Sequence, residues 1–185
     1  MIKLNNVTVR YEDKTVFDNF SLTLKEKGIV LITGPSGCGK TTLIRLLLGL
    51  ISPESGSVDT EGAVISAVFQ EDRLLGNLTA KKNVALVSDD KEAEKRLASV
   101  GLGDSLNLYP HELSGGMKRR VAIARALSFG GDVLLLDEAF NGINEGLARD
   151  ILKNIADEYK DRLIIAVTHQ PELFGGYDYT EINLK

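Results

Sequence analysis

The feature that most constrains this chain is a glycine-rich segment between two apolar runs. Residues 29–32 read Ile-Val-Leu-Ile, and residues 43–48 read Leu-Ile-Arg-Leu-Leu-Leu. The segment between these runs contains Gly34, Pro35, Ser36, Gly37, Cys38, Gly39, Lys40, Thr41 and Thr42. A strand, a loop with this spacing of glycines and Lys-Thr, and a helix form the P-loop pattern, in which backbone N–H groups surround a phosphate. The segment therefore predicts a nucleotide phosphate site.

Each residue type in this loop has a physical reason to be there if the loop binds phosphate. Glycines at 34, 37 and 39 permit backbone conformations that a Cβ would obstruct. The helix that begins near Lys40 directs its positive dipole end at the anion. We expect Lys40 to reach the β- and γ-phosphates, Thr41 to ligate Mg²⁺ and Thr42 to add a phosphate contact. A glycine-rich turn without a ligand is the alternative, and the ordered combination of all these parts disfavours it.

Length and charge limit the classes of protein that the chain can belong to. Its 185 residues, 43% of them hydrophobic, predict one domain over residues 1–185 with room for an inserted subdomain. The net charge of −4 and the pI near 5.3 argue against nucleic-acid binding, which normally needs a basic stripe. No apolar run reaches the roughly 20 residues that cross a bilayer. The single cysteine agrees with a reducing compartment, so we expect a cytoplasmic protein.

Hydrophobic periodicity predicts an α/β fold. Strands are expected at 2–10, 15–24, 28–33, 63–69, 132–138, 163–167 and 179–184, and turns at 12–14 and 52–57. Between residues 71 and 129 the strand-like alternation disappears, and apolar residues recur at helical spacing over 81–87, 91–100 and 117–127. A further helix is expected over 145–159. The chain is expected to form a P-loop core with a mostly parallel sheet, an N-terminal antiparallel β-subdomain and a helical insertion at about 71–129.

Two further stretches contain candidate functional residues. Residues 113–117 read Leu-Ser-Gly-Gly-Met, where Ser114 can cap the next helix and Gly115 and Gly116 leave backbone N–H groups accessible. A capped helix start without a ligand is the simpler explanation of this stretch. Asp137 and Glu138 end a continuous apolar run, and two carboxylates at the end of a buried strand are costly without a cation nearby. An exposed acidic strand end is the alternative there.

These motifs, in this order along one chain, resemble those of the ATP-binding cassette (ABC) ATPases. The resemblance implies that the protein binds ATP and Mg²⁺ and hydrolyses ATP. It implies that Asp137 holds the Mg²⁺ shell and that Glu138 polarises the attacking water. It also implies that Gln70 senses Mg²⁺ and the attacking water, that His169 contacts the γ-phosphate, and that Tyr11 stacks on adenine.

The resemblance also implies partners. Such proteins form head-to-tail homodimers, in which Ser114, Gly115 and Gly116 of one chain contact the γ-phosphate in the P-loop of the other. Residues 68–75 and 109–127 look most like importer subunits for nitrate, sulfonate and taurine-type solutes, which bind transmembrane permease subunits at the inner face of the cell membrane. We expect residues 71–87 to form the docking surface, with candidate apolar contacts at Phe69, Leu74, Leu75 and Leu78.

The sequence departs from the family pattern at two positions, and two alternative functions stay open. Met117 stands where Gln is common, and Asn144 stands where Asp is usual, which removes a charge at the expected dimer seam. Slower or less tightly coupled hydrolysis is the expected effect of Asn144. One alternative is a non-transport ABC ATPase that drives a mechanical rearrangement. The other is a P-loop kinase with Asp137 or Glu138 as the base.

Overall fold

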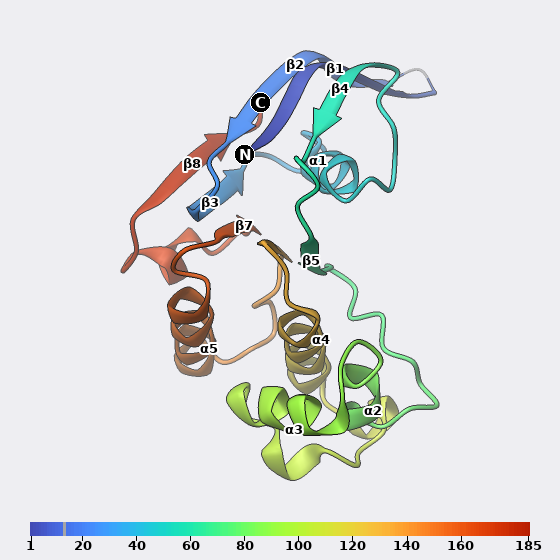
Figure 1. Ribbon diagram of the computed structural model, residues 1–185, viewed down its shortest axis with the longest axis vertical. Helices are drawn as coiled ribbons and strands as arrows, with labels where there is room; N and C mark the ends of the chain where they lie inside the picture. Colours follow the sequence, from blue (N-terminus) through green and yellow to red (C-terminus); the bar gives the residue numbers. More distant parts are fainter. Residues whose placement is uncertain (13) are drawn as a thin grey trace.

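Two sheets form the framework of the protein (Figure 1), in a computed structural model that describes residues 1–12 and 14–185. The first sheet is antiparallel, with the strand order β2-β1-β4. It contains β1 (Ile2–Tyr11), β2 (Lys14–Leu24) and β4 (Ser55–Asp59). The second sheet is parallel, with the order β5-β6-β7-β3-β8. It contains β3 (Gly28–Thr33), β5 (Ile65–Val68), β6 (Val133–Asp137), β7 (Leu163–Val167) and β8 (Tyr179–Asn183).

The helices separate into two groups. Helix α1 (Lys40–Leu47) follows β3 and lies close to the antiparallel sheet, and α5 (Glu145–Glu158) connects β6 to β7. The helices α2 (Ala80–Val84), α3 (Asp90–Ser99) and α4 (Gly115–Phe129) occur between β5 and β6. Figure 1 shows α2 and α3 at the end of the molecule opposite the antiparallel sheet. These features confirm the predicted α/β class, with its parallel core and N-terminal antiparallel part.

The central parallel strands read as continuous apolar runs because both faces of their sheet are covered. One face packs against α1 and the antiparallel sheet, through Val30, Ile32, Val133, Leu135, Leu163, Ile165 and Val167. The other face belongs to a second core that also contains residues of α2 to α5, and its strand residues are Ile29, Leu31, Leu134, Leu136, Ile164 and Ala166. Successive residues of one strand thus point into different cores, as the two-residue period of a strand requires.

The main error in the predicted elements concerns residues 52–57. We expected a turn there, but residues from Ser55 onward form β4, which pairs antiparallel with β1. The sequence Ser-Gly-Ser-Val-Asp has no apolar alternation, and only Val58 packs against the core. Its strand conformation therefore comes from pairing with β1. The predicted turn at 12–14 includes residue 13, which lies outside the described residues.

Among the helices within residues 1–12 and 14–185, none is both long enough and apolar enough to cross a bilayer. The longest helix, α4, has 15 residues, and a span needs about 20.

Candidate active site

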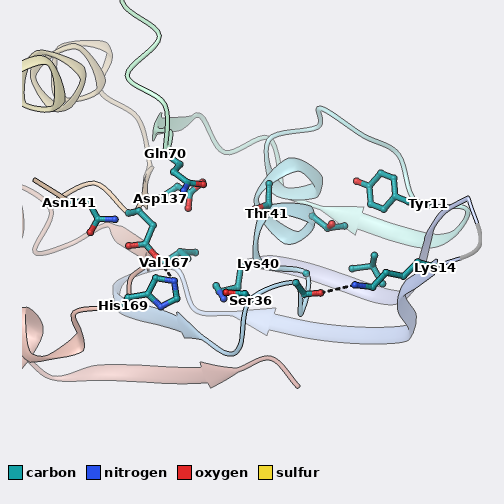
Figure 2. A pocket seen from close by; sticks show the side chains of 15 residues that line it. Tyr11, Lys14, Ser36, Lys40, Thr41, Gln70, Asp137, Asn141, Val167 and His169 are labelled. Carbon is teal, nitrogen blue, oxygen red and sulfur yellow. Dashed lines mark hydrogen bonds and ion pairs between the residues drawn. The ribbon is translucent and has the colours of Figure 1, made fainter. Parts of the chain in front are cut away.

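The predicted site residues follow the carboxyl ends of neighbouring parallel strands. The P-loop follows β3, Gln70 comes two residues after β5, Asp137 ends β6, and His169 comes two residues after β7. Carboxyl ends of parallel strands meet at one edge of the sheet, which is where ligands bind in open α/β folds. A cleft of about 420 Å³ lies at this edge (Figure 2). It is lined by Tyr11, Lys14, Val16, Ser36, Gly37, Gly39, Lys40, Thr41, Thr42, Gln70, Asp137, Glu138, Asn141, Val167 and His169.

The P-loop has a backbone that only glycine permits at two positions. Gly34 has φ +141°, and a Cβ there would lie 2.3 Å from the carbonyl oxygen of Leu184. Gly39 has φ +105°, and a Cβ there would lie 2.8 Å from Cγ1 of Val16. Helix α1 begins directly after Gly39, and its first turn contains no acidic residue. The free N–H groups of this turn are therefore suited to bind an anion, with no acidic side chain of the same turn to compete for them.

The loop residues differ in how directly they face the cleft. The Lys40 ammonium donates hydrogen bonds to the carbonyl oxygens of Gly34 at 2.7 Å and Pro35 at 2.9 Å. Gly34, Pro35 and Cys38 are not among the described residues that line the cleft. Cys38 is half-buried and packs against the core beneath the antiparallel sheet. The nucleotide contacts predicted for these three residues therefore stay predictions.

Asp137 is a buried carboxylate that suits a cation. Its side chain lies at the end of β6, and only 7% of the residue is exposed. Burial, and next the charge of Glu138, raise the pKa of Asp137, while a backbone hydrogen bond from Gln70 and the cations Arg119 and Lys40 oppose that rise. A divalent cation would stabilise the ionised form further. Mg²⁺ typically binds one or two carboxylates together with substrate phosphates, and Asp137 with the Thr41 hydroxyl fits that donor set.

Glu138 is the most unusual residue of the cleft. It is 6% exposed and has φ +50°, a left-handed backbone conformation that is uncommon for glutamate. Neither of its carboxylate oxygens accepts a hydrogen bond from any residue that the structure describes. Nε2 of His169 lies 3.3 Å from Glu138 Oε1, within ion-pair distance (Figure 2). A buried carboxylate without a hydrogen bond is costly, and together with backbone strain it is typical of a functional site.

Sequence reasoning missed part of the cleft. Tyr11 lines it as predicted and is 40% exposed, which leaves its ring available for stacking. Lys14 and Val16 of β2 lie beside it, and the Lys14 ammonium is 3.3 Å from the carbonyl oxygen of Gly37. Asn141 and Val167 also line the cleft and were not predicted. The sequence did contain a signal for Lys14. The alternation of 2–10 and 15–24 implied a hairpin, and in that hairpin Tyr11 pairs with Lys14.

The Ser-Gly-Gly stretch lies away from this cleft. Ser114 caps α4 by accepting a hydrogen bond from the backbone N–H of Met117 at 3.3 Å. Among the described lining residues, none comes from 114–116. A Cβ on Gly116 would lie 2.5 Å from the carbonyl oxygen of Gly142, so this close approach requires glycine. The Met117 side chain is partly buried against the core, which accounts for an apolar residue at this position.

Asn144 has a role within its own chain. Its Oδ1 accepts hydrogen bonds from the backbone N–H groups of Gly146 at 3.0 Å and Leu147 at 3.4 Å. It is thus the N-cap of α5. Asn and Asp are similarly good N-caps. The change from the usual Asp therefore preserves the local structure, while its effect on turnover stays a prediction.

Comparison with known proteins identifies the family. The family model described as ABC transporter matches residues 17–141. The chain belongs to the ABC transporter family. The thiamine import ATP-binding protein of Haemophilus influenzae is 39% identical to this ABC protein, over 96% of this chain and 92% of that protein. An aliphatic sulfonates import ATP-binding protein of Pseudomonas savastanoi is also 39% identical, over 86% of this chain and 70% of that protein.

A solved ABC cassette has the same fold. The dimeric post-hydrolysis structure of the ATP-binding cassette MJ0796, bound to ADP and phosphate, aligns with a TM-score of 0.88 and 28% identity. The alignment covers 100% of this chain and 94% of that one. The protein is therefore an ATP-binding ABC ATPase of the transporter class. These comparisons support the transporter class over the non-transport ABC ATPase and the P-loop kinase.

Proposed function

We propose that this ABC ATPase is the energy-providing subunit of a solute importer, acting as a head-to-tail homodimer on the cytoplasmic face of a membrane permease. The direction of transport rests on the relatives, several of which are named as import proteins. The observation that carries the catalytic part is the buried carboxylate of Glu138 at the P-loop cleft, which accepts no hydrogen bond from the described residues. A water molecule between Glu138 and a γ-phosphate would supply the missing hydrogen bond and become polarised for attack.

The cleft residues divide the chemistry among them. Tyr11 provides a stacking surface for the base, while the N–H groups at the start of α1 and the Lys40 ammonium bind the phosphates. Bound Mg²⁺ neutralises phosphate charge, and Thr41, Asp137 and Gln70 would hold it. Glu138 accepts the proton of the attacking water through its carboxylate. His169, 3.3 Å from that carboxylate and 62% exposed, orients toward the same space and would contact the γ-phosphate.

A site shared between two chains explains the position of Ser114, Gly115 and Gly116. The structure has these residues at the start of α4, outside the cleft of their own chain. Their exposed backbone N–H groups and the capped helix start are suited to bind an anion. In a head-to-tail dimer they would complete the γ-phosphate site of the partner. Neither chain alone then has a full catalytic site.

Mixing two inactive variants tests this arrangement. Glu138→Gln removes the catalytic carboxylate, and Ser114→Arg blocks the partner-facing site. We expect each variant alone to lose ATP hydrolysis, and an equimolar mixture to recover up to about a quarter of the parental rate, because half of the random dimers then contain one intact composite site. Phosphate release at saturating Mg-ATP gives the measurement. No recovery, with dimerisation demonstrated by light scattering, would contradict the shared site.

An apolar groove supports a membrane partner. A groove of about 260 Å³ lies between the end of α1, β5 and the end of α4, and it includes the exposed side chains of Leu50, Val87 and Phe129. Phe69 also lines it, as predicted for the docking surface. Leu74 is only partly buried, and it packs against the core. Exposed apolar side chains that gather in a groove favour a protein partner, such as an amphipathic helix.

This groove lies close to the nucleotide cleft, because Phe69 lines the groove and the next residue, Gln70, lines the cleft. A smaller cavity of about 120 Å³ is lined by Leu50 and Phe69 of the groove and also by Thr41, Gln70 and Asp137 of the cleft. A partner that occupies the groove would therefore contact Phe69, the chain neighbour of Gln70, which is one of the expected Mg²⁺ ligands. This proximity supports the proposal that segment 71–87 and the adjoining groove couple nucleotide state to a permease.

Substitution of Phe129 tests the docking surface. Phe129 is 52% exposed in the groove, and burial of such an anchor commonly contributes 2 kcal/mol or more to binding, about 30-fold in affinity. We expect Phe129→Glu to abolish recovery of a transmembrane subunit from membranes of the source organism, with ATP hydrolysis by the isolated chain unchanged. Tyr179→Glu, on the edge strand β8 and 39% exposed, is the control and should retain recovery. Equal recovery with both variants would exclude this groove.

A further inference from the structure

Arg119 is a buried cation whose role the nucleotide chemistry described above leaves unexplained. It lies on α4 and is 9% exposed. One guanidinium nitrogen donates to the carbonyl oxygen of Phe69 at 2.6 Å, and another donates to the carbonyl oxygen of Gln70. The Nε atom lies 3.1 Å from Oδ1 of Asp72, which supplies a counter-ion. All three partners lie in residues 69–73, which we call the lid segment.

A second arginine of α4 holds the far end of the lid segment. Arg125 donates to the carbonyl oxygens of Asp72 at 3.0 Å and Arg73 at 2.9 Å. Four of the five carbonyl groups in the lid segment therefore accept hydrogen bonds from α4. Such charge-assisted bonds are short and stronger than neutral ones. The lid segment has no helix or strand of its own, so its backbone position depends on these arginines.

The contact of Arg119 with Gln70 is close to the catalytic carboxylates. The Gln70 backbone also lies within hydrogen-bonding reach of the Asp137 carboxylate. Gln70 is thus held on one side by the end of β6 and on the other by α4. Because the same helix begins at Ser114, a displacement of α4 would move the Gln70 backbone with it.

We propose that Arg119 is a positioning residue for ATP hydrolysis. By holding the Phe69 and Gln70 carbonyls, its guanidinium fixes where the Gln70 amide lies relative to Asp137 and Glu138. Arg119 and the N-cap Ser114 belong to the same helix, α4. Arg119 therefore also links Gln70 in the cleft of one chain to the surface that Ser114 presents to the partner chain. This inference rests on the role proposed for Gln70 in the cleft. Arg119 touches no nucleotide, so its loss should affect turnover and leave ATP binding intact.

A double-mutant cycle on the full chain tests the proposal. The variants are Arg119→Gln, Gln70→Ala and the double variant, with kcat and KM for Mg-ATP as readouts. Since misplacement of a catalytic group by about 1 Å can cost about 100-fold in rate, we expect Arg119→Gln to lower kcat by about 10- to 100-fold. KM should stay within about twofold of the parental value. The double variant should have the kcat of Gln70→Ala alone, because Arg119 acts through Gln70.

Control variants separate this effect from a loss of folding. Arg96→Gln removes a similarly buried arginine that pairs with Glu92 and Glu158, away from the lid segment, and should retain the parental kcat. Arg119→Lys keeps the charge beside Asp72 but lacks the planar fork that bonds two carbonyls. It should fold, by circular dichroism and ATP binding, and still lose kcat.

The outcomes distinguish this inference from the proposed role of Gln70. If Gln70→Ala keeps the parental kcat, the role of Gln70 is wrong and this inference is rejected with it. If Gln70→Ala loses kcat but the Arg119 variants do not, only the inference is rejected. If the losses in the double variant multiply, Arg119 acts independently of Gln70, and the positioning role is overturned.

Discussion

Glu138→Gln is expected to lower the rate of ATP hydrolysis by about 10²–10⁴-fold, the usual contribution of a general base. The substitution is nearly isosteric and keeps an amide oxygen at the end of the side chain, but it removes the carboxylate that would polarise the attacking water. The contacts of Tyr11, Lys40 and Thr41 with the nucleotide stay in place. ATP should therefore bind and assemble a dimer that persists, because the dimer is expected to dissociate only after hydrolysis.

Size-exclusion chromatography with light scattering measures the second part of this result. ATP should shift the Gln variant from monomer to dimer, and ADP should not. Glu54→Gln is a matched control, because Glu54 is an exposed glutamate that pairs with Arg10 at 3.1 Å on the antiparallel sheet. It should hydrolyse ATP at the parental rate, since an exposed ion pair contributes little. A Gln variant at Glu138 that stays monomeric at saturating Mg-ATP, or that keeps the parental rate, would reject Glu138 as the catalyst of a dimeric site.

Lys40→Ala is expected to lose nucleotide binding itself. A hydrogen bond to a charged group contributes about 1.5–3 kcal/mol, so an ammonium that contacts the β- and γ-phosphates contributes about 3–6 kcal/mol. The loss corresponds to about 10²–10⁴-fold in Kd for ATP. The fold should survive, because in the structure the Lys40 ammonium is held by two loop carbonyls and not by a buried carboxylate.

Isothermal titration calorimetry with ATP gives the measurement. Lys153→Ala, an exposed lysine of α5, is the control and should bind ATP with the parental Kd. A parental Kd for Lys40→Ala would mean that the phosphates bind elsewhere. The two catalytic variants are then distinct: one binds ATP and fails to hydrolyse it, and the other fails to bind.

Local patterns along the chain were sufficient to predict most of the fold and the P-loop. The strand, loop and helix around Gly34, Gly39 and Lys40 are contiguous, so their geometry follows from short-range backbone preferences and an adjacent helix dipole. The strand 163–167 was predicted with the bounds that the structure has for β7. A strand that is buried on both faces is a continuous apolar run, so it can be predicted without knowing which strands lie beside it. Ser114 as a helix cap was likewise predictable, because a cap bonds a residue only three positions away.

Elements that depend on a distant partner could not be predicted in this way. Strand β4 has a polar sequence, and its conformation comes from pairing with β1, about 50 residues earlier in the chain. The apolar groove brings together Leu50, Val87 and Phe129, which no periodicity connects. The role of Asn144 as the N-cap of α5 is known only from the structure, while its expected position at the dimer seam stays a prediction.

The sequence by itself determined which residues carry the chemistry, because phosphate and Mg²⁺ binding need particular residue types at short, regular spacings. The P-loop and the two carboxylates at Asp137 and Glu138 were enough to predict a nucleotide phosphate site at the carboxyl edge of a parallel sheet, and the resemblance of the ordered motifs to those of the ABC ATPases added ATP hydrolysis. Only the tertiary structure decided how those residues are supported. It buries Glu138 without a hydrogen-bond partner among the described residues, and it brings Arg119 from α4 onto the backbone of Gln70, 49 residues away. Burial and charge pairing across such distances depend on the packing of whole elements, which no local pattern encodes.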